Sequence, residues 1–370
     1  MSDMLRAPAE ISYAAELDHL EKIDHGTKPA NWRLSPQMVR AFILGSQPSD
    51  NLDREIRQKW FGERSIVERA IVTLASDRGL LLIGAPGTGK SFLAELLAAA
   101  ISRNSVQVVQ GTAGTTEDHI KYSWNTAQVI ADGPTAESMI PSPFMTAMLT
   151  GTIGRFEELT RAPSDVQDAL ISALSEKYIA VPELGDSGTV FARPGFALIA
   201  TANSRDQGVN DLSSALKRRF NFVTIPVVTD ERSERQIVNF RTEELLKRHG
   251  LALDIPPTLL EVLQRSFNDL RKVAEKAGSD DDRLESPLST AEQIGVLEDA
   301  ILHSTFFAAG SLTAATLASS LVSSLARRAP EDRAILNKYL STTVKQHSDQ
   351  HGGEWPEFLT AGLSTLKALA

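Results

Sequence analysis

The sequence predicts an α/β fold: a mostly parallel sheet covered by helices on both faces, followed by a region that is entirely helical. Three observations predict it. Between about residues 51 and 229, short apolar runs alternate with amphipathic helical patterns. A glycine-rich loop joins the first of these runs to a helical pattern. Beyond residue 230, apolar residues recur at helical spacing, and we find no convincing strand.

The individual elements follow from these patterns. Apolar runs predict strands at residues 80–83, 106–109, 152–156, 196–200 and 222–225. The third is a weaker prediction, because Gly154 and Arg155 stand where apolar residues are expected. Helical spacing predicts helices at 91–101 and 164–175.

We divide the chain into four parts. Residues 1–50 are an N-terminal extension packed on the main body, with one short helix that Ser35 caps and Pro36 begins. Residues 51–229 form the α/β core. Residues 230–310 and 311–370 form two helical regions, and the charged segment 278–283 is a loop within the first of them.

Composition excludes several classes of protein. The chain has 370 residues, 38 Lys and Arg against 47 Asp and Glu, and a net charge of −9. An acidic chain is a poor candidate for non-specific binding to nucleic acid or to membranes. The chain has no cysteine, which excludes disulfides, thiol nucleophiles and iron–sulfur clusters. With neither a signal peptide nor an apolar run of membrane-spanning length, we expect a soluble, cytoplasmic protein.

The glycine-rich loop has the sequence GAPGTGKS, which matches GxxxxGK[ST] between a strand and a helix. Backbone amides of such a loop wrap an anion, and the helix N-terminus favours negative charge. Lys90 would reach the β- and γ-phosphates, and the Ser91 hydroxyl would bind Mg²⁺. The residues expected to bind nucleotide here are Gly84, Ala85, Pro86, Gly87, Thr88, Gly89, Lys90, Ser91 and Phe92.

Two adjacent carboxylates end the weaker strand. Glu158 is the expected base that activates the attacking water, and Glu157 is the expected acid at the metal, in contact with Mg²⁺ directly or through water. The alternative is a solvated acidic pair before a loop.

Polar residues also follow other strands. Asn203, after the run FALIA, can orient the attacking water, or it can serve as a cap or turn residue. Arg218 and Arg219 end a short helix, where the helix dipole alone explains cations. The alternative is an arginine finger that reaches into a neighbouring subunit's site.

Taken together, these motifs resemble the AAA+ ATPases, specifically the MoxR group, over about residues 55–305. GAPGTGKS resembles the family's Walker A motif, RFEELTRAPSDVQDALISALSE its Walker B segment, and FALIATANSRDQGVNDLSSALKRRF its sensor-1 strand with the residues that follow. The resemblance implies that Asn203 is the sensor residue and Arg219 the finger, with Arg218 as a second candidate. It also implies that Trp60, Phe61 and Gly62 pack on the adenine base, although a plain core role explains them equally well.

The resemblance also implies two insertions, and the sequence departs from the family's pattern at individual positions. Residues 122–143 match the family's insert in the second helix, and residues 177–193 match a hairpin before sensor 1. Glu157 replaces the usual Walker B Asp. In the helical lid, Leu288 stands where the family's sensor-2 Arg is expected, and Arg283 is nearby but is not assigned a place.

By this resemblance the chain is a P-loop AAA+ core followed by an α-helical lid, and its cofactors are ATP and Mg²⁺. The implied function is ATP-driven, chaperone-like remodelling that activates or assembles a client protein. The implied assembly is a ring, expected to be a hexamer, with an adaptor that carries a von Willebrand A domain. Two alternatives remain: a nucleotide-dependent scaffold with little turnover, and a nucleic-acid-associated motor, against which the net charge counts.

Overall fold

The computed structural model describes residues 4–46, 54–204, 212–228, 230–276, 288–308, 310–326 and 330–369. The described residues form two compact units. The first comprises residues 4–85 and 89–227. The second comprises the described residues from 228 onward, together with loop residues 86–88. The N-terminal extension therefore belongs to the same unit as the α/β core.

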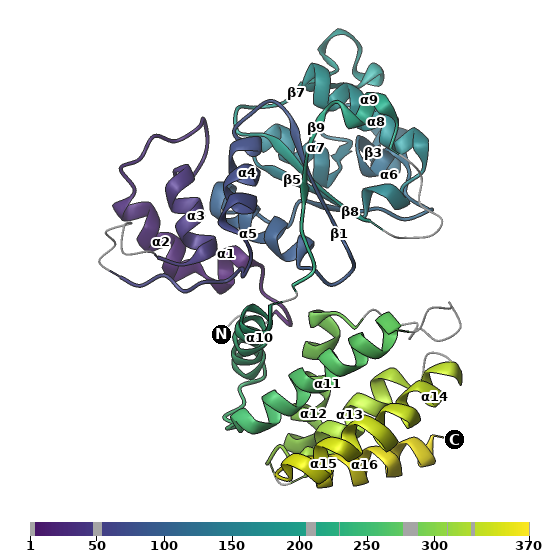
Figure 1. The fold of residues 1–370 in the computed structure, drawn as a ribbon. Coiled ribbons are helices and arrows are strands. Elements are labelled where there is room, and N and C mark those ends of the chain that lie inside the picture. The colour runs from purple at the N-terminus through teal and green to yellow at the C-terminus, as the bar shows by residue number, and fades with distance from the viewer. Residues whose placement is uncertain are drawn as a thin grey trace. The chain divides into compact units, whose positions relative to one another are not determined.

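The first unit is built on a five-stranded sheet with the order β2-β5-β8-β1-β9 (Figure 1). All four strand pairs are parallel, as expected from the alternation of strands and helices. The strands are β1 (Gly79–Gly84), β2 (Val108–Gln110), β5 (Ile153–Glu157), β8 (Ala197–Asn203) and β9 (Phe220–Thr224). The expected boundary of β2 is wrong, because Val106 lies outside the strand and is 59% exposed.

Helices cover both faces of this sheet. Leu80 and Leu82 of β1 pack in one core with α4 (Arg64–Leu74) and α5 (Lys90–Ser102). Leu81 points to the opposite face and packs with α7 (Pro143–Thr150) and α8 (Ser164–Glu176). This alternation is what a strand buried on both faces requires. The short α9 (Ser214–Lys217) precedes β9.

The N-terminal extension adds the helices α1 (Ala9–Ser12), α2 (Ala14–Ile23) and α3 (Pro36–Leu44). The Ser35 hydroxyl accepts a hydrogen bond from the Met38 amide, and Pro36 occupies the first turn of α3, as predicted. Phe42 and Leu17 are fully buried in the core that also contains α5. These helices thereby help to fix the helix that follows the phosphate loop.

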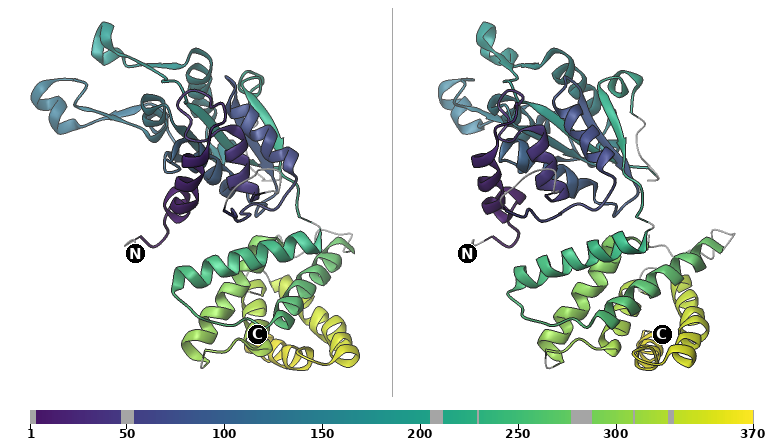
Figure 2. Two further views of the ribbon diagram at one scale, coloured as in Figure 1. Left: turned by 90° about the vertical axis from the view of Figure 1, so that its left-hand side faces the viewer. Right: turned by 60° about the vertical axis from the view of Figure 1, so that its left-hand side comes forward.

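Two antiparallel hairpins extend from the body of the first unit (Figure 2). One pairs β3 (Tyr122–Trp124) with β4 (Met139–Pro141) and carries α6 (Thr126–Asp132) between them. The other pairs β6 (Tyr178–Ala180) with β7 (Thr189–Phe191), as expected for residues 177–193. The Tyr122 hydroxyl donates to Glu183 at 2.7 Å, which ties the first hairpin to the segment between β6 and β7.

The second unit is helical throughout its described residues. Its helices are α10 (Glu231–His249), α11 (Pro257–Lys276), α12 (Thr290–Phe307), α13 (Ala314–Leu325), α14 (Pro330–Tyr339), α15 (Lys345–His351) and α16 (Trp355–Ala368). A π-helical turn, Leu340–Val344, joins α14 to α15. One hydrophobic core runs from Val238 to Leu366, so the regions 230–310 and 311–370 share it. Across the described chain, every helix is too short or too polar to span a bilayer.

Candidate nucleotide site

The phosphate loop lies between the end of β1 at Gly84 and the start of α5 at Lys90. Gly87 and Gly89 have φ angles of 77° and 84°, in the left-handed region that favours glycine. The Lys90 side chain is buried, and its Nζ donates to the carbonyls of Gly84 at 3.0 Å and Ala85 at 2.8 Å. The loop therefore has the backbone form and the cation that phosphate binding needs.

Glu157 is the centre of the second part of the site. It ends β5 and is only 7% exposed. Its Oε2 accepts hydrogen bonds from the Ser91 hydroxyl at 2.6 Å and the Thr201 hydroxyl at 2.7 Å. The structure thus brings together Ser91 and Glu157, the two residues that the sequence predicts at the metal.

The oxygens of Ser91 and Glu157 are of the kind that bind magnesium. Ser91 Oγ and Glu157 Oε2 are oxygen ligands, which Mg²⁺ prefers, and they lie within 2.6 Å of each other. No cluster of three or more His, Asp or Glu side chains that could hold a metal occurs among the described residues. A site with one carboxylate and one hydroxyl fits Mg²⁺, which keeps several waters and takes further oxygens from substrate phosphates.

Thr201 was not among the predicted site residues. It lies in β8, is 2% exposed, and donates to Glu157 while accepting from the Glu158 amide at 3.0 Å. One hydroxyl thus positions both adjacent glutamates. The available signal was a threonine directly after the apolar run FALIA.

Glu158 has a different environment from its neighbour. Its φ angle is 55°, in the left-handed region, which turns the chain out of β5. Its side chain is 35% exposed and forms an ion pair with Arg161 at 2.9 Å. Strained backbone of this kind is often found at functional sites. Gly111 packs against this turn so closely that a Cβ there would lie 2.3 Å from the Glu158 carbonyl oxygen.

Asn203 lies where the sequence predicts it. It is the last residue of β8 and pairs in register with Gly84, the last residue of β1. Since the carboxyl ends of parallel strands meet at one edge, Asn203 is placed beside the start of the phosphate loop.

The two arginines follow the short helix α9, which ends at Lys217, and they differ in their surroundings. Arg219 is half-buried; its Nη1 donates to the Ala215 carbonyl at 2.6 Å, and its Nε donates to the Ser175 hydroxyl. Arg218 is exposed, and its side chain contacts no hydrogen-bond or ion-pair partner within the described part of the chain. In the described part of the chain, the hydrogen bonds to Glu157 come from Ser91, Thr201 and Arg155, and not from either of these arginines.

The aromatic segment before α4 places Trp60 nearest to the loop. Trp60 is 6% exposed, and its ring covers Gly62 so closely that a Cβ there would lie 2.3 Å from it. Its Nε1 would lie 3.6 Å from a Cβ on Gly89. Phe61 and Phe92 are half-buried. The sequence allowed either a core role or an adenine-binding role for this segment. Trp60 is buried in the core and also lies beside the loop.

Arg155 is the departure in β5 that the sequence singled out. It is 8% exposed, and its Nη2 forms an ion pair with Glu157 Oε1 at 2.6 Å. It also donates to the backbone carbonyls of Ser105 at 3.0 Å and Ser91 at 3.2 Å. The buried arginine is therefore compensated by a carboxylate two residues along on the same face of the strand.

In the helical unit, Leu288 is 8% exposed and belongs to the hydrophobic core. Its carbonyl accepts from Arg271 Nε at 2.6 Å. Arg271 also pairs with the buried Glu234 at 2.5 Å. Leu288 is therefore a core residue, and Arg283 lies outside the described residues.

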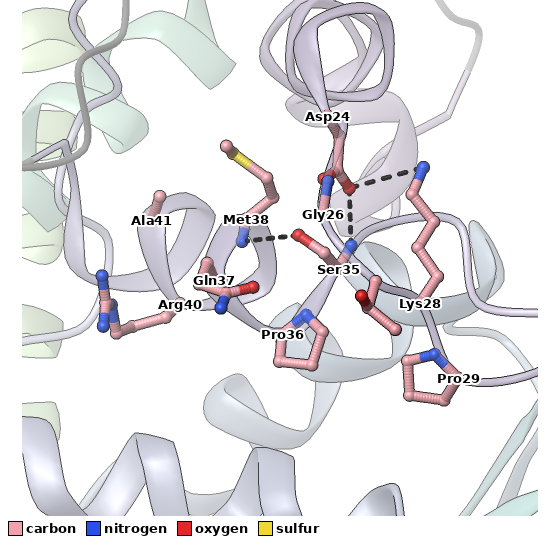
Figure 3. Close-up of a pocket in the computed structure, with 11 residues that line it drawn as sticks. Asp24, Gly26, Lys28, Pro29, Ser35, Pro36, Gln37, Met38, Arg40 and Ala41 are labelled. Carbon is pink, nitrogen blue, oxygen red and sulfur yellow. Dashed lines mark hydrogen bonds and ion pairs between the residues drawn. The ribbon is translucent and has the colours of Figure 1, made fainter.

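A cavity of about 880 Å³ lies among the N-terminal helices and not at the phosphate loop (Figure 3). Its polar groups bond to one another: Asp24 Oδ2 accepts from the Ser35 amide at 2.6 Å and pairs with Lys28 at 3.4 Å. Burial opposes ionisation of Asp24, but the hydrogen bonds from Ser35 and Gly26 and the Lys28 charge hold its pKa below the ordinary value. This corner fixes the start of α3.

Two family models match the chain. An AAA domain of the dynein-related subfamily matches residues 79–220, and a YehL-like AAA+ ATPase C-terminal domain matches residues 232–361. The first covers the strands β1, β2, β5 and β8, the phosphate loop and the paired glutamates. The second covers most of the helical unit.

Two relatives and one solved structure are similar to parts or most of this chain. The uncharacterized protein YehL of Escherichia coli is 42% identical over 347 residues, which is 94% of each chain. Chaperone MoxR1 of Mycobacterium tuberculosis is 27% identical over 61% of this chain and 53% of its own length. Among solved structures, NtrX of Brucella abortus in complex with ADP aligns over 84% of this chain and 70% of that chain, with 14% identity and a TM-score of 0.49. The extent of the match to YehL, together with the two family models, shows that the chain belongs to the YehL-like AAA+ ATPases of the MoxR group.

Proposed function

We propose that this protein hydrolyses ATP at the site around Lys90 and Glu157, and that it uses the reaction to remodel a client protein. The observation that carries the proposal is the convergence of Ser91 and Glu157 at 2.6 Å, directly behind a loop that holds a buried lysine. A hydroxyl and a carboxylate at the end of a phosphate loop are what a metal–nucleotide complex requires.

The roles of the residues follow from their positions. Lys90 would exchange its bonds to the loop carbonyls for the β- and γ-phosphates. Ser91 and Glu157 would hold Mg²⁺, which when bound neutralises charge on the transferring phosphoryl group. Glu158, more exposed and one residue on, would take a proton from the attacking water, and Asn203 would orient that water.

A ring assembly belongs to the same proposal. We expect ATP between subunits of a ring, with Arg219 completing the site of the neighbour and Arg218 as the second candidate. Arg219 would have to leave its bonds to Ala215 and Ser175 to do so. An adaptor with a von Willebrand A domain and a client protein are expectations that rest on the MoxR group.

A scaffold with little turnover is the second candidate function. Two observations favour it: Leu288 is buried in the core, and Glu157 already bonds a cation, Arg155. Steady-state phosphate release, measured alone and with a partner, separates the two functions.

The nucleotide-binding part of the proposal is tested with Lys90→Ala. Loss of the only lysine of the loop should weaken ATP binding by at least about 100-fold, because a charge-assisted contact to two phosphates is lost. The control is Lys121→Ala, which removes an exposed lysine that pairs with Glu117. Equal ATP affinity in the two variants would contradict the assignment of the loop.

The ring is tested by mixing subunits. Arg219→Ala and Glu158→Gln proteins should each turn over ATP poorly, and a finger is worth on the order of 10³–10⁵ in rate. In mixed rings, some interfaces combine an intact Glu158 with an intact Arg219, so activity should partly return. No return of activity in rings shown to be mixed, or full activity from a monomer, would rule out the finger.

A further inference from the structure

Arg155 is the least expected residue of the β5 strand. Arginine is rarely buried unless it is paired. Here it is 8% exposed in a strand whose five residues are all buried. Burying a charged side chain costs desolvation free energy unless hydrogen bonds and an opposite charge compensate for it. The contacts that compensate for Arg155 therefore indicate its role.

The guanidinium group bonds to three parts of the site. Nη1 donates to the Ser105 carbonyl at 3.0 Å, beside the start of β2. Nη2 donates to the Ser91 carbonyl at 3.2 Å and to Glu157 Oε1 at 2.6 Å. Its Nε is buried without a partner in the described part of the chain. One rigid fork therefore ties the first turn of α5 to the carboxylate at the end of β5.

The two oxygens of the Glu157 carboxylate have different partners. Oε1 accepts from Arg155, and Oε2 accepts from Ser91 and Thr201. A glutamate is longer than an aspartate by one methylene, about 1.5 Å. That length lets one carboxylate reach the arginine on its own strand and the serine on α5.

We propose that Arg155 is a positioning residue: by holding Oε1 it keeps Oε2 of Glu157 at Ser91, and so makes nucleotide binding dependent on Mg²⁺. The inference rests on the proposed function and deepens it. Without Arg155, a buried carboxylate would lose its charged partner and could rotate away from Ser91. Partners of metal-binding carboxylates act in this way, and their loss costs about 10- to 100-fold in metal affinity or activity.

The test measures the affinity of a fluorescent ATP analogue twice, in EDTA and in excess Mg²⁺, for Arg155→Met and Arg155→Lys. In EDTA we expect affinities close to that of the unaltered protein, because Lys90 and the loop are intact. The tightening that Mg²⁺ brings should fall by about tenfold or more in Arg155→Met. Arg155→Lys should lose less, because lysine restores the charge without the fork.

A matched control lies at the C-terminal end of α5, the helix whose first turn Arg155 contacts. Arg103 follows α5 and pairs with Asp18 at 2.6 Å and Glu21 at 2.9 Å. Arg103→Met removes a comparable ion-paired arginine from the first unit and should leave the Mg²⁺ effect unchanged. An equal loss in both variants would reduce Arg155 to a structural residue.

Two further results would overturn the proposal. One is an unchanged effect of Mg²⁺ in both Arg155 variants. The other is a loss of affinity that is as large in EDTA as in Mg²⁺. Should Arg155→Met fail to fold, Arg155→Lys carries the test, with a reduced Mg²⁺ effect expected. Failure of the proposed function itself is recognised separately, since Lys90→Ala would then bind ATP normally.

Discussion

Among the described residues, Glu234 of the helical unit and Glu157 of the sheet unit are buried and pair with an arginine, and they differ in what else the carboxylate bonds. In the helical unit, both oxygens of Glu234 accept from the fork of Arg271, at 2.5 and 3.2 Å. In the sheet unit, Arg155 takes only one oxygen of Glu157, and two hydroxyls bond the other. The two glutamates are similarly buried, at 2% and 7% exposed.

This difference in partners distinguishes the Arg271–Glu234 pair, which we regard as structural, from the Arg155–Glu157 pair at the candidate site. Both oxygens of Glu234 accept from one charged guanidinium group, and Oε1 also accepts from the Thr290 hydroxyl at 3.3 Å. Glu157 Oε2 instead bonds neutral hydroxyls, which a divalent cation can displace or share. The two glutamates are alike in burial and charge, so the groups that bond their remaining oxygens distinguish the proposed site pair from the structural pair.

The largest expected contrast is in turnover. Glu157→Gln should lower the ATPase rate on the order of 100-fold, because the carboxylate charge at the metal is lost. Glu234→Gln removes the same charge from the other unit and should leave the ATPase rate close to that of the unaltered protein. The measurement is steady-state phosphate release at saturating Mg²⁺ and ATP.

Thermal unfolding of both variants provides the control. If Glu157→Gln is as well folded as the unaltered protein, its loss of activity is not caused by unfolding. Comparable loss of turnover in both variants would end the distinction between a structural pair and a site pair.

The next contrast is in stability. Arg271→Met leaves Glu234 buried without its partner and should lower the free energy of unfolding by about 3 kcal/mol or more. The matched control is Arg248→Met, on the exposed face of α10, where a change of no more than about 0.5 kcal/mol is expected. Calorimetry of the full chain measures both. A change as small as that of the control would mean that the Glu234 pair contributes nothing to the fold.

The smallest contrast concerns the two threonines. Thr201→Val removes a hydroxyl that donates to Glu157 and accepts from the Glu158 amide, so about 1–3 kcal/mol of stability should be lost. Thr290→Val removes one bond to Glu234, at 3.3 Å, and should cost about 0.5–1.5 kcal/mol. Only the first should also slow ATP turnover. Slower turnover in Thr290→Val would show that Glu234 is linked to the reaction.

The sequence was sufficient where one local pattern determines the structure. β1, the loop and α5 were predictable because the motif, the apolar run and the helical spacing agree. The pairing of Ser91 with Glu157 was predictable because the carboxyl ends of parallel strands meet at one edge of the sheet. Arg155 and Glu157 also lie two residues apart, and so share a face of β5.

What was missed depends on contacts between distant segments. Thr201 looks like an ordinary strand residue until β8 is placed beside β5. The left-handed turn at Glu158 is matched by a close approach of Gly111, which no local pattern announces. Val106 is apolar but exposed, and so the start of β2 was placed two residues too early. That Arg219 or Arg218 acts as a finger in a neighbouring subunit stays a prediction, because such a contact would lie between two chains.

We expect Glu158 to activate water at a site where Glu157 holds the metal. The most direct measurement compares ATP binding and phosphate release in the unaltered protein and in Glu158→Gln. We predict similar ATP affinity for both, with phosphate release in Glu158→Gln lower by about 10²–10⁴, because an amide keeps the shape but cannot take a proton. Equal rates of phosphate release in the two proteins, or no Mg²⁺-dependent release from the unaltered protein, would contradict this account.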